Sequence, residues 1–439
     1  DLHSFPTRRS SDLDLFEVYA DKLGFITINQ GKSKSDTYKM IIRLYSTSEW
    51  KAEGSGIDNQ IGMLSLSRWA YTSRGGQTVA HEIGHCFQYQ VHCDNGDWNG
   101  WMYNWHESTV NPFWEMCAQW MAYVYYPGKL LNDNEWLWNS LNGMHRHPLA
   151  GYLRYENFFI QDLFVHKHGW DAVGRLWNDC RDPEDPFETY MRTRMTGTTS
   201  QKVSQLGDEL WEWGARMTTF DLDPIRSIGD GKASWRSQTA LTKDDDGYWW
   251  PEKKDCIENY GNNAIRLNAP SKAKTLYVEF EGKAGADGYT AKNITRAGWR
   301  IGFVAFKSDG TRVYGDMHRA GYNDADQLIA FDCPAGCSHV WLVISGAPST
   351  YWTHNFTGWI DNTEEQWPYR VRFYQTNVYG EANNDDVPTG VEGVEDTEAL
   401  RREDFAIHDL SGRRLGQGAP ALRSLRHGIY VVGGKKVAK

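Results

Sequence analysis

The fold is decided by the stretch Thr78-Val79-Ala80-His81-Glu82-Ile83-Gly84-His85-Cys86-Phe87-Gln88, which contains the motif His-Glu-x-x-His. Residues four positions apart lie on the same face of an α-helix, so His81 and His85 are predicted to direct two imidazole nitrogens at one metal ion. Glu82 then lies beside the metal, where it can take a proton from a water molecule. The alternative interpretation is a helix that carries two surface histidines.

A third ligand is needed, because a catalytic zinc has three protein ligands and one open position. A motif that continued with glycine at position 88 and histidine at position 91 would supply this ligand, but the residues there are Gln88 and Val91. The remaining candidates are two downstream acids, Glu107 and Glu115. Glu107 lies in a stretch rich in Gly, Asn and Trp, where a solvated side chain is expected.

Glu115 belongs to a segment with a helical pattern, from Asn111 to about Tyr126. Asn111 suits the N-cap and Pro112 the first helical position. Apolar side chains lie on nearly every side of this predicted helix, which indicates that the helix is buried. A buried carboxylate is costly unless it is paired or bound to a metal, so Glu115 is the preferred third ligand.

The composition limits the possible partners of the chain. It has 439 residues, enough for two or three domains. Its net charge of −10 argues against a nucleic-acid partner. No apolar run is long enough to span a bilayer. The 21 tryptophans and 23 tyrosines exceed what is usual, and such aromatics suit surfaces that bind peptides or sugar rings.

The predicted fold class is α+β. Residues 1–13 resemble the conceptual translation of a sequencing adapter and are left out of the fold prediction, so a native N-terminus and any signal peptide are expected to be missing. The expected regions are a catalytic domain at 14–222, a linker at 223–245, a β-sandwich domain at 246–375, an acidic linker at 376–404 and a small C-terminal β domain at 405–439.

Two early segments are predicted to be strands of the catalytic domain. The pattern at 39–45 indicates a buried strand, and a loop rich in Gly and Ser follows around Gly54-Ser55-Gly56. Residues 61–67 alternate apolar and small polar residues, which predicts a half-exposed strand. A free edge of that strand would suit an extended peptide, although an ordinary sheet strand is an equal alternative.

The motif and the Glu115-x-x-Ala118-x-Trp120 helix together resemble the gluzincin metallopeptidases. This resemblance implies that His81, His85 and Glu115 bind one zinc ion and that Glu82 is the general base. The interval between His85 and Glu115 is longer than in compact gluzincins. The resemblance is greatest, over residues 35–220, to a family of secreted bacterial zincin-like proteins of unknown function, which a β-sandwich accompanies.

Hydrolysis also requires a donor that stabilises the negative charge that develops on the carbonyl oxygen. Four residues that follow the third-ligand helix are candidates by their order in the sequence, with core or surface packing as the alternative: His145, His147, Tyr152 and Tyr155. Acceptors that orient the two ligand histidines are also required, and the sequence does not identify them.

Cysteines and tryptophans allow further interpretations. Cys86 and Cys117 adjoin ligand residues and are expected to fill the core rather than to form a disulfide. Cys333 and Cys337 could close a short loop by a disulfide in an oxidising compartment. Five tryptophans of the sandwich region suit either a buried core or stacking on a glycan: Trp249, Trp250, Trp352, Trp359 and Trp367.

The C-terminal segment Asp409-Leu410-Ser411-Gly412-Arg413-Arg414, followed by Gly428-Ile429-Tyr430-Val431-Val432, resembles the sorting domains of the type IX secretion system. The resemblance implies a protein that is secreted or held at the cell surface. The sequence as a whole predicts a secreted zinc metallopeptidase that acts on proteins or glycoproteins. The alternatives are a glycan-binding protein with an idle zincin fold and a zinc hydrolase of a non-peptide bond.

Overall fold

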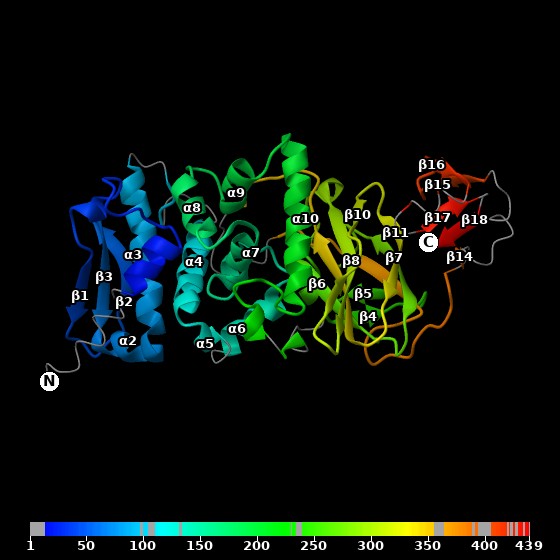
Figure 1. The fold of residues 1–439 in the computed structure, drawn as a ribbon, viewed down its shortest axis with the longest axis horizontal. Helices are drawn as coiled ribbons and strands as arrows, with labels where there is room; N and C mark the ends of the chain where they lie inside the picture. The colour runs from blue at the N-terminus through cyan, green and yellow to red at the C-terminus, as the bar shows by residue number, and fades with distance from the viewer. Residues whose placement is uncertain are drawn as a thin grey trace. The chain divides into compact units, whose positions relative to one another are not determined.

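The computed structural model describes most of the chain, namely residues 14–96, 100–103, 110–130, 134–229, 231–233, 239–354, 364–388, 391–393, 405–418, 421, 425, 429–432 and 435–438. Two compact units are present. The first contains Asp1–Leu206, Phe220–Lys232 and Thr350–Glu364, and the second contains Gly207–Thr219, Ala233–Ser349 and Glu365–Lys439. Helices and several antiparallel sheets occur together (Figure 1), so the fold is of the mixed α+β class. The predicted limits of the five regions stay predictions.

A three-stranded sheet opens the first unit. Its strands are β1 (Ile41–Tyr45), β2 (Ala52–Ile57) and β3 (Ile61–Ser67), in the order β1-β3-β2. β1 runs parallel to β3, and β2 runs antiparallel to it. The long helix α3 (Gln77–Asn95) lies beside these strands (Figure 1) and carries the His-Glu-x-x-His motif.

The two predicted strands are present, but their environments differ from the prediction. β1 was expected to be buried, yet four of its five residues are exposed because it forms an edge of the sheet. β3 was expected to be half-exposed with a free edge. It is instead the central strand, almost fully buried, with a partner on either side. The edge strand nearest the motif is therefore β2.

β2 replaces the loop that the glycines and serines suggest. A Cβ atom on Gly54 would lie 1.9 Å from the carbonyl oxygen of Glu82 and 2.7 Å from Cβ of His85. Glycine is thus required here because the strand passes directly against the motif helix, not because the chain turns. This close approach places the backbone of β2 beside the motif.

Helices form the rest of the first unit. Helix α4 (Val110–Tyr125) corresponds to the predicted third-ligand helix and packs against α3. The others are α2 (Arg68–Thr72), α5 (Pro127–Leu130), α6 (Asn134–Gly143), α7 (Phe159–His168), α8 (Ala172–Asp179), α9 (Pro186–Arg194), the first part of α10 (Thr199–Met217) and α11 (Arg226–Gly229). No helix in the described part of the chain is long and apolar enough to cross a membrane.

Two antiparallel sheets make up most of the second unit. One has the order β10-β8-β12-β6 with β9 paired to β8, and the other has the order β11-β7-β13-β5-β4. Their strands are β4 (Leu241–Lys243), β5 (Trp249–Pro251), β6 (Asn262–Leu267), β7 (Lys274–Gly282), β8 (Gly298–Lys307), β9 (Arg312–Tyr314), β10 (His318–Gly321), β11 (Asp326–Cys333), β12 (Cys337–Gly346) and β13 (Tyr369–Tyr374). Ring contacts such as Phe280–Trp299 and Phe303–Phe331 join the two sheets.

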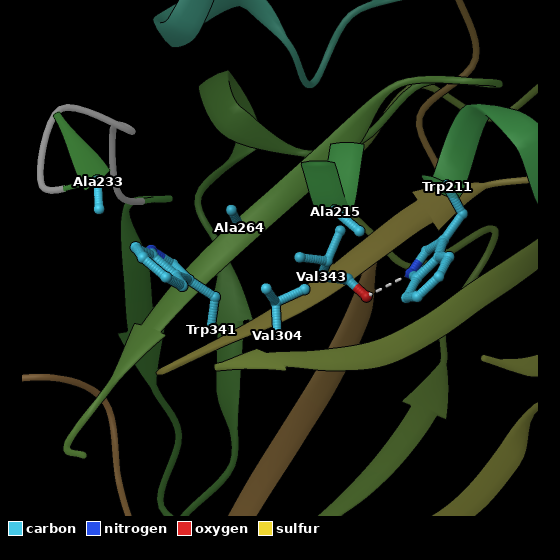
Figure 2. Packing of buried hydrophobic residues seen from close by; sticks show 7 residues of the cluster. All are labelled: Trp211, Ala215, Ala233, Ala264, Val304, Trp341 and Val343. Atoms are coloured by element: carbon cyan, nitrogen blue, oxygen red, sulfur yellow. Dashed lines mark hydrogen bonds between the residues drawn. The ribbon is translucent and has the colours of Figure 1, made fainter. Parts of the chain in front are cut away.

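The second part of α10 packs on the first of these sheets. Figure 2 shows Trp211 and Ala215 of the helix beside Val304, Trp341 and Val343 of the sheet. The indole Nε1 of Trp211 donates a hydrogen bond of 3.0 Å to the carbonyl oxygen of Val343. Burial of a large aromatic surface with its polar atom satisfied stabilises this contact.

A further sheet lies near the C-terminus. It contains β14 (Val391–Gly393), β15 (Ala406–His408), β16 (Arg414–Gln417), β17 (Ile429–Val432) and β18 (Lys435–Ala438), in the order β14-β18-β17-β15-β16. Phe405, Ile407 and Val432 form its small core. Strands β15 to β18 lie in the region 405–439, for which the sequence predicts a small β domain.

Candidate metal centre

The motif helix and the helix after it bring three ligand groups together. Nε2 of His81 and Nε2 of His85 each lie 3.2 Å from the same oxygen of Glu115, Oε2. One ligand atom from each residue lies within 4.8 Å of the other two, and all three residues are buried. Among the described residues, His81, His85 and Glu115 form the one cluster of histidine, cysteine and acidic side chains that could hold a metal.

Helices α3 and α4 approach closely enough for this arrangement because of Gly84. A Cβ atom at this position would lie 3.1 Å from Cα of Ala118, which is tighter than an ordinary contact. Ala118 itself adds only a methyl group to the crossing. Glu115 lies one turn before Ala118 on α4, so the crossing holds its carboxylate opposite the two histidines.

The second nitrogen of each histidine is held by a glutamine. Nδ1 of His81 is 3.0 Å from Oε1 of Gln119, and Nδ1 of His85 is 2.7 Å from Oε1 of Gln88. The amide of Gln88 is oriented by its own donation to the carbonyl oxygen of Trp114, at 2.8 Å. Gln77 donates to Oε1 of Gln119 at 3.0 Å. Each imidazole therefore donates a hydrogen bond from Nδ1 and points Nε2 towards Glu115.

This donor set fits a metal cation. Two lone pairs and a carboxylate oxygen converge in a buried space, and this is unfavourable unless a positive charge lies between them. Without a metal, a proton supplies that charge. Burial alone would lower the pKa of His85, but the charge and hydrogen bond of Glu115 raise it to about 9. Burial would also raise the pKa of Glu115, and the two histidines lower it instead. Nitrogen and carboxylate ligands are those of catalytic zinc sites, although the donor set alone does not identify the metal.

Loss of one orienting glutamine is expected to weaken metal binding. Gln119→Leu removes the acceptor of both His81 and Gln77, so the imidazole of His81 loses its fixed tautomer. Metal affinity should fall by about 10- to 100-fold, as for other partners of ligand histidines. Isothermal titration with a divalent metal measures this change. Gln161→Leu, a buried glutamine of α7 that bonds Cys117, is the matched control and should bind as the wild type does.

Metal affinity is also expected to depend on pH. Since His85 keeps a proton up to about pH 9 in the metal-free protein, an incoming metal must displace it at neutral pH. The apparent affinity should rise about tenfold for each pH unit between about 6 and 8, and should level off near the pKa of His85. Competition against a chelator of known proton affinity measures this slope. A flat profile over that range would contradict the proposed geometry.

Glu82 lies beside this group and has a separate anchor. The backbone N–H of Gly54 in β2 donates to Oε2 of Glu82 at 2.6 Å. Glu82 is buried, and it is not one of the three residues whose ligand atoms converge. Its position beside the three ligand residues agrees with the spacing of the motif, and its role as a general base stays a prediction.

A pocket of 440 Å³ opens onto these residues. One wall is the edge strand β2, from Ala52 to Ser55, and the floor contains His81, Glu82, His85 and Glu115. Aromatic side chains line the rest, namely Tyr89, Tyr103, Trp114 and Tyr155. A partly aromatic pocket with a few converging polar groups is typical of a binding site for a small molecule or a peptide segment.

Only one of the four predicted charge-stabilising candidates lies in this pocket. The ring of Tyr155 is 6.0 Å from that of His81, and burial together with the charge of Glu115 raises its pKa. Tyr103, which the sequence does not single out, lines the same pocket, and the same two causes raise its pKa to about 12. Both phenols therefore keep their protons at neutral pH and can donate hydrogen bonds.

The other three candidates lie elsewhere. His145 is bonded to the carbonyl oxygen of Asn142, and His147 is buried and stacked on His354 with ring centroids 4.0 Å apart. Tyr152 is exposed, with Arg146 over its ring. None of the three lines the pocket. Glu107, the alternative third ligand, lies outside the described residues.

The cysteines are free thiols. Cys86 and Cys117 are buried, as expected for residues that fill the core, and Sγ of Cys117 accepts hydrogen bonds from Gln161 and Trp177. The Sγ atoms of Cys333 and Cys337 are 3.8 Å apart and not bonded, so the structure does not contain the disulfide that the sequence allows for this loop.

The described tryptophans that were candidates for sugar stacking offer little exposed surface. Trp249 of β5 and Trp367, just before β13, are buried, and Trp250 is half-buried with its Nε1 bonded to Asp244. Trp352 is half-buried as well, in the first unit. Trp359 lies outside the described residues. Burial of the side chains that were candidates for sugar stacking weakens that interpretation.

Fold and geometry thus define a mixed α+β protein with a buried two-histidine, one-glutamate group that can hold a metal. The chain belongs to a family described as "Family of unknown function (DUF6055)", whose model matches residues 12–380. No curated protein matches the sequence at a significant level.

Parts of the chain are similar to solved structures. The mitogen YPM from Yersinia pseudotuberculosis is 10% identical, with coverage of 34% of this chain and 96% of its own and a TM-score of 0.19. The C-terminal family 22 carbohydrate-binding module of Clostridium thermocellum Xyn10B is 11% identical, with coverages of 33% and 83% and a TM-score of 0.20. Scores this low support no conclusion about the fold or function of this chain.

Proposed function

We propose that the protein is a secreted, zinc-dependent metallopeptidase that hydrolyses peptide bonds of proteins or glycoproteins. The observation that carries the proposal is the convergence of His81, His85 and Glu115 in one pocket, with the carboxylate of Glu82 beside them. In this proposal the first unit is a gluzincin-like catalytic domain, and the two antiparallel sheets of the second unit are an accessory β-sandwich. The C-terminal sheet is a type IX sorting domain that directs export.

The ligands in this proposal are Nε2 of His81, Nε2 of His85 and the carboxylate of Glu115. Bound zinc supplies a Lewis acid that polarises the scissile carbonyl and lowers the pKa of water. Gln88 and Gln119 hold the two imidazoles in the tautomer that leaves Nε2 free to bind. A buried carboxylate opposite them adds one negative charge, which favours a divalent cation over a monovalent one.

The chemical step in this proposal belongs to Glu82. Its free oxygen accepts a proton from the attacking water and delivers that proton to the leaving amine. The hydrogen bond from the N–H of Gly54 fixes the other oxygen, so the base does not swing away from the pocket. Tyr155 and Tyr103 are the donors available to the carbonyl oxygen as its negative charge develops.

Substrate binding is attributed to the edge of β2. The N–H of Gly54 points away from β3 towards the pocket, and Ala52, two residues before it, has the same orientation because strand residues alternate. The N–H of Gly54 is taken by Glu82, but the N–H of Ala52 can pair with an extended peptide, which then lies across the pocket. A peptide substrate explains why an edge strand forms one wall of the site.

Mass spectrometry of digestion products tests the proposal. The protein is incubated with casein and a set of glycoproteins, and new peptide termini are identified with and without a zinc chelator. Chelator-sensitive new termini are the expected result. Their absence, combined with hydrolysis of ester or other non-peptide substrates, would instead indicate a zinc hydrolase of another bond. Absence of all hydrolysis would favour an idle zincin fold.

A further inference from the structure

The edge strand β1 presents an unusual apolar surface. Ile41, Ile42 and Leu44 are 44%, 47% and 64% exposed, although they belong to a strand of the sheet that carries the motif helix. Among the described residues β1 pairs only with β3, so its other edge presents unpaired backbone N–H and C=O groups. Proteins usually cover or charge such an edge, because it is a template for pairing with another strand.

An apolar groove of 370 Å³ lies along this strand. Its lining includes Phe16, Met40, Ile42, Leu64, Ile83 and Cys86. Ile42 is in register with Leu64 of β3, which is buried beneath α3. The apolar face of the sheet therefore extends beyond helix α3, which packs on it. The groove lies along β1, where α3 no longer covers this face.

The charged side chains that belong to β1 or line the groove are positive. Lys39 lines the groove, and no acidic residue does. The guanidinium of Arg43 donates a hydrogen bond of 3.1 Å to the hydroxyl of Tyr45 and forms no ion pair with a described residue. The ammonium of Lys51 lies over the Tyr45 ring, 4.4 Å from its centroid. These three positive groups contrast with the net charge of −10 for the whole chain.

We infer that β1 is a docking edge for an extended polypeptide segment whose side chains alternate between apolar and acidic. The backbone of the segment pairs with the open edge of β1 and satisfies its unpaired groups. Every second side chain points to the face of the sheet that holds the groove, so the apolar set enters the groove. The acidic side chains of the segment lie on the opposite face of the sheet. Arg43 lies on that face as well, because it follows Ile42 and side chains alternate along a strand.

The same observations disfavour two other occupants. A second copy of β1 that paired in antiparallel register around Arg43 would bring the two Arg43 side chains together, and like charges on neighbouring strands are destabilising. A lipid surface would leave the N–H and C=O groups of the edge without partners, because hydrocarbon offers no hydrogen bonds. A polypeptide of opposite charge satisfies both the backbone and the basic side chains.

Fluorescence anisotropy tests the inference with the full chain and two labelled peptides, one alternating valine with glutamate and the other alternating valine with lysine. The valine–glutamate peptide should bind, and added salt should weaken it. Ile42→Asp should lower its affinity by about tenfold or more, because apolar burial in the groove is lost. Arg43→Glu leaves the groove intact and should shift the preference to the valine–lysine peptide.

Leu410→Asp, which changes an exposed leucine of the second unit, is the control and should bind as the wild type does. Circular dichroism and metal binding at His81 and His85 establish that each variant is folded. The inference is overturned if neither peptide binds, or if Arg43→Glu binds both peptides as the wild type does. It is equally overturned if sedimentation shows a dimer that Ile42→Asp dissociates, or if anionic vesicles bind the wild type and the peptides do not.

Discussion

Glu82→Gln is expected to lower the rate of peptide hydrolysis by about 10²- to 10⁴-fold, the usual contribution of a general base, with metal content unchanged. The amide has the size of the carboxylate and can still accept the hydrogen bond from the N–H of Gly54. It cannot take a proton from water. The three metal ligands are not altered, so this variant separates metal binding from the hydrolytic step.

Casein hydrolysis and metal content per chain, measured on the same preparations, give the two readouts. Glu49→Gln, an exposed carboxylate just before β2, is the control and should keep full activity. Equal cleavage by wild type and Glu82→Gln would remove Glu82 from the mechanism. Loss of metal together with activity would mean that Glu82 is itself a ligand.

The second large effect is expected for Glu115→Ala. It removes the charged ligand of the group and leaves two neutral imidazoles. Metal affinity should fall by more than about a hundredfold, since loss of a partner outside the ligand set alone costs 10- to 100-fold. In the metal-free protein the pKa of His85 should also fall from about 9, because the charge of Glu115 holds it there against the effect of burial.

Titration with zinc measures the affinity, and nuclear magnetic resonance of the imidazole follows the pKa of His85. The second readout depends on the position of the carboxylate and not on enzymatic activity. Glu107→Ala is the control and should leave both values unchanged. If Glu107→Ala loses metal and Glu115→Ala does not, the third ligand must be reassigned to Glu107.

The part of the site that lies within one helix follows from the sequence. The spacing of His81 and His85 places both rings on one face of α3, and this depends only on helix periodicity. Glu115 could also be inferred, because an acid in an otherwise apolar helix requires a partner. The strand-rich character of residues 246–375, where β5 to β13 lie, could be predicted as well, since alternation and turns are local signals.

The parts that depend on distant contacts did not follow from the sequence. Gln119 is 38 positions from His81, and its role arises from the crossing of two helices. Tyr103 lies in a stretch rich in Gly, Asn and Trp, where a pocket residue carries no distinguishing pattern. β2 resembled a loop because the glycines that let it pass against α3 are the residues that also mark turns.

Exposure of β1 could not be predicted either. The segment 39–45 has the composition of a buried strand, and burial was expected on that basis. Its position at the sheet edge is set by the order β1-β3-β2, which the sequence does not encode locally. Such a conflict between an apolar pattern and an exposed strand marks a surface for which a partner is expected.

Stoichiometric reconstitution of chelator-treated protein with zinc tests the central claim most directly. Casein hydrolysis is followed while zinc is added to protein freed of metal. Hydrolysis should be absent at first, should rise in proportion to the added zinc and should stop rising at one zinc per chain. Hydrolysis that persists after complete removal of metal, or protein that binds no zinc, would contradict the claim.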